Sequence, residues 1–275
     1  MRKIAIRWID HIRQLDMDVL EETFALAGDL PLKLLEIGGG NGFVASKLSG
    51  LGLNVVSIDP DPRQPSFYHV QQGDCVKLEF PDDSFDIIFS SNVLEHVEDI
   101  KTAFAEMKRV LRPEGIMIHT MPTPLNTVLT FLTQPVRYIF GLGFVLAQTY
   151  RVIKNKLRGH KNNNDLSDNL SSDSDPKKLN KQNMREVFKH LNPLRILIPW
   201  HHGASPSCFT ELHDWKRTSW IELFESNGFA VEQTVDLPLA YSRNIVFPFC
   251  FEKLRKHIAE SISPSCRAYI AKPEL

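Results

Sequence analysis

The chain has 275 residues, of which 43% are hydrophobic and 24% are charged. These proportions are typical of a soluble globular protein, and the length suits one large α/β domain with an insertion. A net charge of −1 argues against a generally basic nucleic-acid-binding protein, so no nucleic-acid partner is expected. The four cysteines form no C-x-x-C pair, which favours a reducing, cytoplasmic location over a disulfide framework or a zinc site.

The first predicted element is an amphipathic helix near the N-terminus. Ile4, Trp8, Ile12 and Leu15 recur on one helical face, so we expect this helix to cover an edge of the domain. Charged residues interrupt the segment and no cleavage site follows it, which argues against a secretion signal. No run of 18 apolar residues occurs, so a membrane-spanning helix is not expected.

A glycine-rich segment, LLEIGGGNGFVASKL, follows at residues 34–48. Its first residues predict a short buried strand, and its last residues repeat at helical spacing. The turn between them holds Gly38, Gly39, Gly40 and Gly42. Glycines at such a turn let backbone N–H groups come close to a ligand, so we expect a binding site here.

Strands and helices then alternate as far as Pro122. Residues 53–60 predict a second strand that ends at Asp59, residues 66–74 contain a third, and a fourth begins at Phe85. A helix is expected over residues 99–115, ended by Pro113 and Gly115, and a fifth strand over 115–122. This order predicts right-handed βαβ units and a mostly parallel sheet, whose ligands bind at the carboxyl ends of the strands.

The alternation stops between residues 123 and 204. Residues 125–150 are apolar and predict two helical pieces around Pro135, residues 151–161 are basic without an acid, and residues 162–178 are polar and expected to be disordered. An apolar stretch followed by a basic cluster suits contact with a membrane surface through residues 125–161. A lid over an acceptor pocket and a dimer interface are the alternatives, and the oligomeric state stays open.

The alternating pattern returns near the C-terminus. Residues 218–237 predict a helix and a sixth strand, residues 249–262 a further helix, and residues 266–273 a closing strand. The predicted parts of the chain are therefore a ligand-binding half at 1–122, an insertion at 123–204, and a completion of the fold at 205–275.

The glycine turn does not fit the dinucleotide fingerprint G-x-G-x-x-G, because Phe43 occupies the third glycine position. The pattern E-x-G-x-G-x-G, formed by Glu36, Gly38, Gly40 and Gly42, instead resembles the first motif of the class I S-adenosylmethionine-dependent methyltransferases. The resemblance implies a Rossmann-like, doubly wound α/β fold. The elements predicted above give a mostly parallel sheet of seven strands with an insertion after the fifth. These counts match the family, in which the seventh strand runs antiparallel between strands five and six.

A second stretch, GDCVKLEFPDDSFDIIFSSNVLEHV at residues 73–97, also resembles this family. In such proteins the acid at Asp59 accepts the ribose hydroxyls, and Asp74 with the backbone of Cys75 holds the adenine. The resemblance implies S-adenosylmethionine as cofactor and S-adenosylhomocysteine as product. The expected cofactor-binding residues are Glu36, Gly38, Gly40, Asp59, Pro60, Asp74, Cys75, Ser90 and Asn92.

The same resemblance bears on the acceptor. Proteins with a motif like LEHV at residues 94–97 act mostly on small molecules, quinones, lipids and sugars, so a methyltransferase for such an acceptor is expected. Residues 90–93 lack the Asn-Pro-Pro-aromatic motif of the DNA base methyltransferases, which disfavours that substrate. A non-catalytic methyltransferase-like assembly protein and a nucleotide-binding oxidoreductase remain the alternatives.

An oxygen or carbon acceptor usually needs a general base, most often histidine. His201 and His202 stand just before the returning fold and are the expected catalytic residues, with Glu211 as an orienting partner. His119 and His213 are the other candidates. No metal is expected at His201 and His202, because no third ligand follows at a clear spacing.

Overall fold

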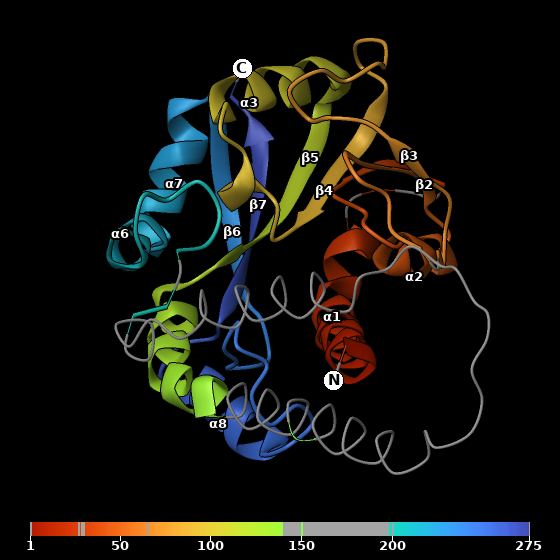
Figure 1. Cartoon of the computed structure of the whole chain (residues 1–275). Helices are drawn as coiled ribbons and strands as arrows, with labels where there is room; N and C mark the ends of the chain where they lie inside the picture. The colour runs from red at the N-terminus through yellow and green to blue at the C-terminus, as the bar shows by residue number, and fades with distance from the viewer. Residues whose placement is uncertain are drawn as a thin grey trace, which may run out of the picture. The chain divides into compact units, whose positions relative to one another are not determined.

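The computed structural model describes residues 2–26, 28, 31–64, 66–139, 150, 198–199 and 201–274 (Figure 1). The chain divides into two compact units, Met1–Leu129 with His201–Leu275, and Thr130–Trp200. The predicted basic cluster and the predicted disordered stretch lie outside the described residues, as does most of the second apolar piece. The predicted sheet and the predicted site both fall in the first unit.

A seven-stranded sheet forms the centre of the first unit, with the strand order β3-β2-β1-β4-β5-β7-β6. The first five strands pair in parallel, whereas β7 lies antiparallel between β5 and β6. This arrangement confirms the predicted fold class, including the direction and place of the last strand. The strands are β1 Lys33–Ile37, β2 Asn54–Asp59, β3 Val70–Gln72, β4 Phe85–Ser91, β5 Leu111–Pro122, β6 Phe229–Asp236 and β7 Cys266–Pro273.

Helices cover both faces of this sheet (Figure 1). Helices α3 and α7 pack on one face through Phe104 and Phe224, and helices α1 and α2 pack on the other through Leu20 and Leu48. Side chains alternate across the strands, so each face has an apolar layer of its own. The helices are α1 Arg2–Leu26, α2 Phe43–Gly50, α3 Ile100–Val110, α6 Cys208–Asp214, α7 Arg217–Ser226 and α8 Glu252–Ser261, with the 3-10 turn η1 Leu94–His96 and a helical stretch over residues 124–139.

The end of α3 differs from the prediction. The helix was expected to run to Pro113 and Gly115, but it ends at Val110 and β5 begins at Leu111. The residue before a proline is disfavoured in the helical region, because the proline ring clashes with its backbone, and the chain therefore becomes extended before Pro113. The pairing of β4 with β5 shifts between Phe85 and Ile87 as a result of this early start.

The N-terminal helix forms as predicted, although its apolar stripe is only partly buried. Trp8 and Ile12 are buried and pack with Leu239, whereas Ile4 is 52% exposed. The edge that α1 covers therefore begins about one turn later than the sequence pattern indicates. In the described part of the chain, no helix combines the length and apolarity needed to cross a membrane.

Helix α1 also buries an acid, and this makes stability depend on pH. Burial raises the pKa of Asp16 to about 7, against the opposing effect of Arg13. The folded state then binds a proton more tightly than the unfolded state does. The stabilisation from this proton is fully present below the unfolded pKa of Asp16, near 3.8, and is lost as pH rises through 7.

We predict that Asp16→Asn raises the free energy of unfolding at pH 8 relative to the natural chain, by at most about 4 kcal/mol. At pH 4 the two proteins should differ little, because the natural carboxyl is then protonated in the folded state. Urea unfolding at both pH values measures this difference. Asp18→Asn, on the exposed side of the same helix, is the control. Equal effects of both substitutions at pH 8 would contradict the prediction.

Candidate functional site

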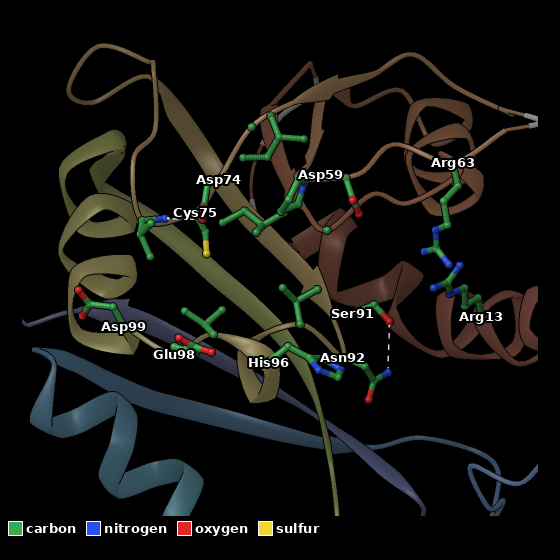
Figure 2. Close-up of a pocket in the computed structure, with 18 residues that line it drawn as sticks. Arg13, Asp59, Arg63, Asp74, Cys75, Ser91, Asn92, His96, Glu98 and Asp99 are labelled. Atoms are coloured by element: carbon green, nitrogen blue, oxygen red, sulfur yellow. Dashed lines mark hydrogen bonds between the residues drawn. The ribbon is translucent and has the colours of Figure 1, made fainter. Parts of the chain in front are cut away.

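A cavity of about 630 Å³ opens at the carboxyl ends of β1, β2 and β4 (Figure 2). In the strand order, β1 has β2 on one side and β4 on the other, so the chain reverses its direction across the sheet at this point. Open α/β sheets bind ligands at such a switch point. The volume lies within the range of roughly 300–1,000 Å³ that is usual for small-molecule sites.

The glycine turn forms one wall of the cavity. Gly38, Gly40 and Gly42 all have positive φ angles, of 78°, 57° and 73°. The amides of Gly38 and Gly39 donate to the carbonyl of Ile58, at 2.8 and 3.0 Å, which holds the turn against the end of β2. A Cβ atom on Gly38 would lie 2.3 Å from Val93 Cγ2. Both the conformation and the close packing therefore require glycine at position 38.

Asp59 joins the end of β2 to this turn. Its Oδ2 accepts from the amide of Gly40 at 2.8 Å, and its Oδ1 accepts from the amide of Asp61 at 2.8 Å. A carboxylate has about four acceptor positions, so each oxygen can accept a further hydrogen bond from a ligand. Asp59 and the neighbouring Pro60 both line the cavity.

Glu36, Gly40 and Ser90 lie close to the cavity but do not line it. Glu36 is 3% exposed and accepts from the Ser57 hydroxyl, and burial raises its pKa to about 7. Ser90 is fully buried and shares a hydrogen bond of 2.6 Å with His119 Nδ1. Gly40 packs under the guanidinium of Arg63. The structure thus places these predicted residues where they can support the site without lining it.

Asp74 and Cys75 line the cavity from the loop after β3 (Figure 2). Asp74 is exposed, and its Oδ1 accepts from the amide of Val76 at 3.1 Å. Cys75 is buried, and burial together with the charge of Asp74 raises the pKa of its thiol to about 11. The thiol therefore stays protonated near neutral pH and is poorly suited to act as a nucleophile.

Asn92 follows β4 and lines the cavity in a strained conformation. Its φ angle is 54°, in the left-handed region that few residues other than glycine adopt. Its amide donates to the carbonyl of Thr120 at 2.9 Å, and its Oδ1 accepts from Cys266 Sγ at 3.2 Å. Backbone strain that the surrounding contacts maintain is common at functional sites.

Two arginines that the sequence analysis did not single out stand at one end of the cavity. Arg13 comes from α1 and Arg63 from the segment after β2, and Figure 2 shows their guanidinium groups close together. Burial and the neighbouring Arg63 lower the pKa of Arg13. Two positive charges that face each other at a cavity wall suit an anionic group of a ligand. The sequence shows Arg13 only as one of several charges on an amphipathic helix.

A cluster of Glu95, His96 and His202 lies at the edge of the cavity that is formed by η1. His96 lines the cavity, and its ring centroid lies 4.4 Å from that of His202, at 76°. Each residue offers a donor atom, and these three atoms lie within 4.8 Å of one another. Burial, followed by His96 and Arg243, lowers the pKa of His202 to about 3. The ring of His202 is therefore uncharged and weakly basic at neutral pH, and its nitrogen can accept a hydrogen bond or bind a metal ion.

Backbone hydrogen bonds hold the segment of His202 against this turn. The amide of Ala204 donates to the carbonyl of Glu95 at 2.7 Å. Gly203 has a φ angle of 67°, and a Cβ atom there would lie 1.9 Å from that carbonyl oxygen. Glu211, predicted to orient a histidine, accepts a hydrogen bond from the backbone amide of His202 instead of its ring. The position of His202 is therefore fixed by the main chain.

The other candidate histidines lie elsewhere. His201 is exposed and does not line the cavity, and His213 is exposed on α6. His119 is fully buried on β5, and burial lowers its pKa to about 3. Of the predicted histidines, His202 is the one that the structure brings to the edge of the cavity.

Comparisons with known proteins agree with this geometry. Residues 35–119 match the model of a methyltransferase domain family. An uncharacterized methyltransferase of Mycolicibacterium vanbaalenii is 37% identical over 117 residues, which are 36% of this chain and 46% of that protein. One of Mycobacterium tuberculosis is 34% identical over 118 residues, 35% of this chain and 46% of that protein. The chain thus spans less than half the length of these curated relatives.

Two solved structures are similar as well. A Mesorhizobium loti S-adenosylmethionine-dependent methyltransferase gives a TM-score of 0.47 at 15% identity, covering 94% of this chain and 99% of its own. The Burkholderia thailandensis 1,6-didemethyltoxoflavin-N1-methyltransferase, with bound S-adenosylhomocysteine, gives 0.48 at 10%, covering 96% and 78%. Residues 35–119 thus resemble a methyltransferase domain. The sheet order and the glycine turn are those that the resemblance to the class I S-adenosylmethionine-dependent methyltransferases predicts.

We predict that Gly38→Ala lowers the free energy of unfolding by about 1–3 kcal/mol, since a side chain at its positive φ angle costs about 1–2 kcal/mol and the new methyl group meets Val93. Gly50→Ala is the matched control, because open space surrounds Gly50 at the end of α2. That change should be neutral or stabilising by up to about 1 kcal/mol. Urea unfolding measures both, and equal effects would show that the turn tolerates a side chain.

Proposed function

We propose that the protein is an S-adenosylmethionine-dependent methyltransferase that acts on a small-molecule, lipid, quinone or sugar acceptor. The observation that carries the proposal is the cavity at the β1–β4 switch point, where Asp59 is tied to the glycine turn through Gly40. A turn that leaves no room for a Cβ atom and a carboxylate with free acceptor positions fit a ligand with a ribose. The family match over residues 35–119 supports the same reading.

The residues around the cavity suit the parts of this cofactor in order. Asp59 would accept the ribose hydroxyls, and Pro60 would border the adenine. Asp74 and the backbone of Cys75 would hold the edge of the adenine ring. All four residues line the cavity, and they come from the ends of β2 and β3, so neighbouring strands present them together.

At the other end of the cavity, Arg13 and Arg63 would hold the carboxylate of the methionine part, because charged hydrogen bonds are stronger than neutral ones. Asn92 would lie near the sulfonium. Glu36 and Ser90, which are buried behind the wall, would hold the turn and β4 in place without touching the ligand. We therefore propose a positioning role for these two residues.

When bound, S-adenosylmethionine would supply a methyl group on a positively charged sulfur, and the nucleophile of the acceptor would take the methyl group in line while the thioether leaves with the electron pair of the broken carbon–sulfur bond. The protein contributes mainly by holding the acceptor close to that position, an effect of about 7–11 kcal/mol in well-oriented systems. His202 and His96 stand at the edge where an acceptor would approach, and we propose that His202 acts on it. A role of the exposed His201 in catalysis stays a prediction.

Two rival functions would leave different signatures. A nucleotide-binding oxidoreductase would bind NAD, whereas the turn of this chain lacks the third glycine of that fingerprint. A non-catalytic assembly protein with this fold would bind the cofactor weakly or not at all. Calorimetry with S-adenosylhomocysteine, S-adenosylmethionine and NAD separates the three classes.

We predict that Asp59→Ala weakens S-adenosylhomocysteine binding by about 1.5–3 kcal/mol, the range for a lost hydrogen bond to a charged group. Asp61→Ala is the matched control, since Asp61 is exposed two positions further on and contacts Asp59 only through its backbone amide. Titration calorimetry on both folded variants gives the affinities. Unchanged affinity in Asp59→Ala would remove Asp59 from the site, and no binding to the natural chain would overturn the proposed function.

We also propose that the insertion contacts a membrane surface through one face of its helical stretch at 124–139. On the helical stretch at 124–139, Leu132 and Ile139 are each 68% exposed, and their spacing of seven residues puts them on one face. The basic residues at 151–161 follow in the sequence, and each basic residue near an anionic surface contributes about 1 kcal/mol. A peripheral location at the inner membrane surface, in an otherwise cytoplasmic protein, would suit a lipid-like acceptor.

We predict that the protein sediments with anionic liposomes at low salt and is released at high salt. Replacing Leu132 and Ile139 together with Ser should lower the bound fraction several-fold, because exposed apolar side chains insert at the interface. Ile262→Ser, which removes a 74% exposed apolar side chain after α8, is the control. A natural chain that stays in the supernatant at low salt would instead favour a lid or a dimer interface.

A further inference from the structure

We propose that Glu95, His96 and His202 form a binding site for one divalent transition-metal cation, of which Zn²⁺ is the representative, at the acceptor edge of the cavity. The site joins η1, which follows β4, to the segment that precedes α6. The metal site itself stands on geometry alone. Its role in catalysis rests on the proposed methyl transfer.

The donor set is the first observation behind this proposal. Two imidazole nitrogens and one carboxylate oxygen lie within 4.8 Å of one another. Zn²⁺ takes such ligands at about 2.0–2.2 Å, and two histidines with one glutamate, plus one open position, form a known kind of catalytic zinc site. Small side-chain rotations would bring the three atoms to these distances. Mg²⁺ prefers oxygen ligands and fits this set poorly.

The second observation is independent of the first. Glu95 is only 6% exposed, and neither of its carboxylate oxygens has a hydrogen-bond partner in the described part of the chain. A buried polar group without a partner is costly, and an ionised carboxylate is the costliest case. A cation bound between Glu95 and the two imidazoles would supply the missing interaction. Native proteins keep such groups mainly where they serve a function.

Backbone hydrogen bonds preorganise the proposed metal site. The hydrogen bond from the Ala204 amide to the Glu95 carbonyl ties the two ligand-bearing segments directly to each other, and Gly203 allows their close approach. His96 is held in η1 through its own amide, which donates to the carbonyl of Val93 at 2.8 Å. Ligands that are already in place lower the entropy cost of binding.

A positive charge beside the cluster, that of Arg243, is already compensated. Arg243 acts on both Glu95 and His202 electrostatically and would repel a metal ion. Its guanidinium, however, donates to both carboxylate oxygens of the fully buried Glu211, at 3.1 and 2.8 Å. It also lies over the ring of Trp215, at 5.2 Å from the centroid. The pair of Arg243 and Glu211 is close to neutral, so the carboxylate of Glu95 remains available to the cation.

On the proposed function, an ion at this place would act on an acceptor hydroxyl. His96 lines the cavity, so the open position of the ion would face the acceptor. A bound cation lowers the pKa of a hydroxyl that coordinates to it, and the proton leaves to solvent. The oxygen then forms a bond to the methyl carbon while the carbon–sulfur bond breaks, and that bond's electron pair stays on sulfur. The site thus favours oxygen acceptors over amines.

The test uses the full chain, freed of metal by a chelator and dialysed. Titration with Zn²⁺ in a calorimeter and with Co²⁺ by visible absorption should each show one ion per chain. We predict that Glu95→Gln and His202→Asn weaken Zn²⁺ binding by more than about 100-fold, since loss of an outer partner alone costs about 10–100-fold. His201→Asn is the matched control. His201 is an exposed neighbour outside the cluster, so this variant should bind Zn²⁺ as tightly as the natural chain does.

Thermal unfolding and S-adenosylhomocysteine calorimetry on the same samples keep the outcomes distinct. Zn²⁺ should raise the unfolding temperature of the natural chain and of His201→Asn, but not of the two ligand variants, because only a folded site binds it. S-adenosylhomocysteine binding should persist in all four proteins. The metal site is wrong if the natural chain binds no ion. It is also wrong if Glu95→Gln and His202→Asn bind the ion as tightly as the natural chain does. If the natural chain binds Zn²⁺ but not S-adenosylhomocysteine, the proposed function is overturned and the metal site is still supported.

Discussion

The hydrogen bond from the Gly40 amide to the Asp59 carboxylate is the contact on which the rest of the site depends. It joins the turn after β1 to the end of β2 and fixes the positive φ angle at Gly40. The same turn is held from below by Ile58 and from behind by the buried pair of Glu36 and Ser57. Once this geometry is set, the other cavity-lining residues arrive from neighbouring strand ends, because parallel strands bring their carboxyl ends to one edge of the sheet.

Two buried glutamates show how structural and functional carboxylates differ in this fold. Glu211 accepts hydrogen bonds from Arg243, Thr127 and the His202 amide, so its charge is satisfied by the protein itself. Glu95 lies nearby at a similar depth, yet its carboxylate has no partner among the described residues. Satisfied networks of the first kind make a site rigid. A buried carboxylate of the second kind is stable when another group, such as a bound cation, supplies the missing interaction.

Features that depend on neighbouring residues could be predicted from the sequence, whereas features that depend on the packing of distant segments could not. The glycine turn and Asp59 follow from local patterns of strand, turn and helix. The sequence pattern predicts too late an end for α3, because the apolar period continues through Leu111, whereas the helix ends at Val110, before the backbone that Pro113 restricts. Arg13 reaches the cavity only because α1 packs on the sheet, and the pairing of His202 with Glu95 appears only after α6 and its preceding loop return to η1.

The charges around the cavity also favour one orientation of a bound ligand. Figure 2 shows Arg13 and Arg63 at one end, and the acids Asp74, Glu98 and Asp99 toward the other. A ligand with a carboxylate at one end would place that group against the arginines, since the opposite orientation would bring like charges together. The middle of such a ligand would then lie beside Asn92 and His96, which both line the cavity. The polarity of the walls therefore supports a reacting centre next to the cluster of Glu95, His96 and His202, at the edge where the acceptor and the proposed cation would meet it.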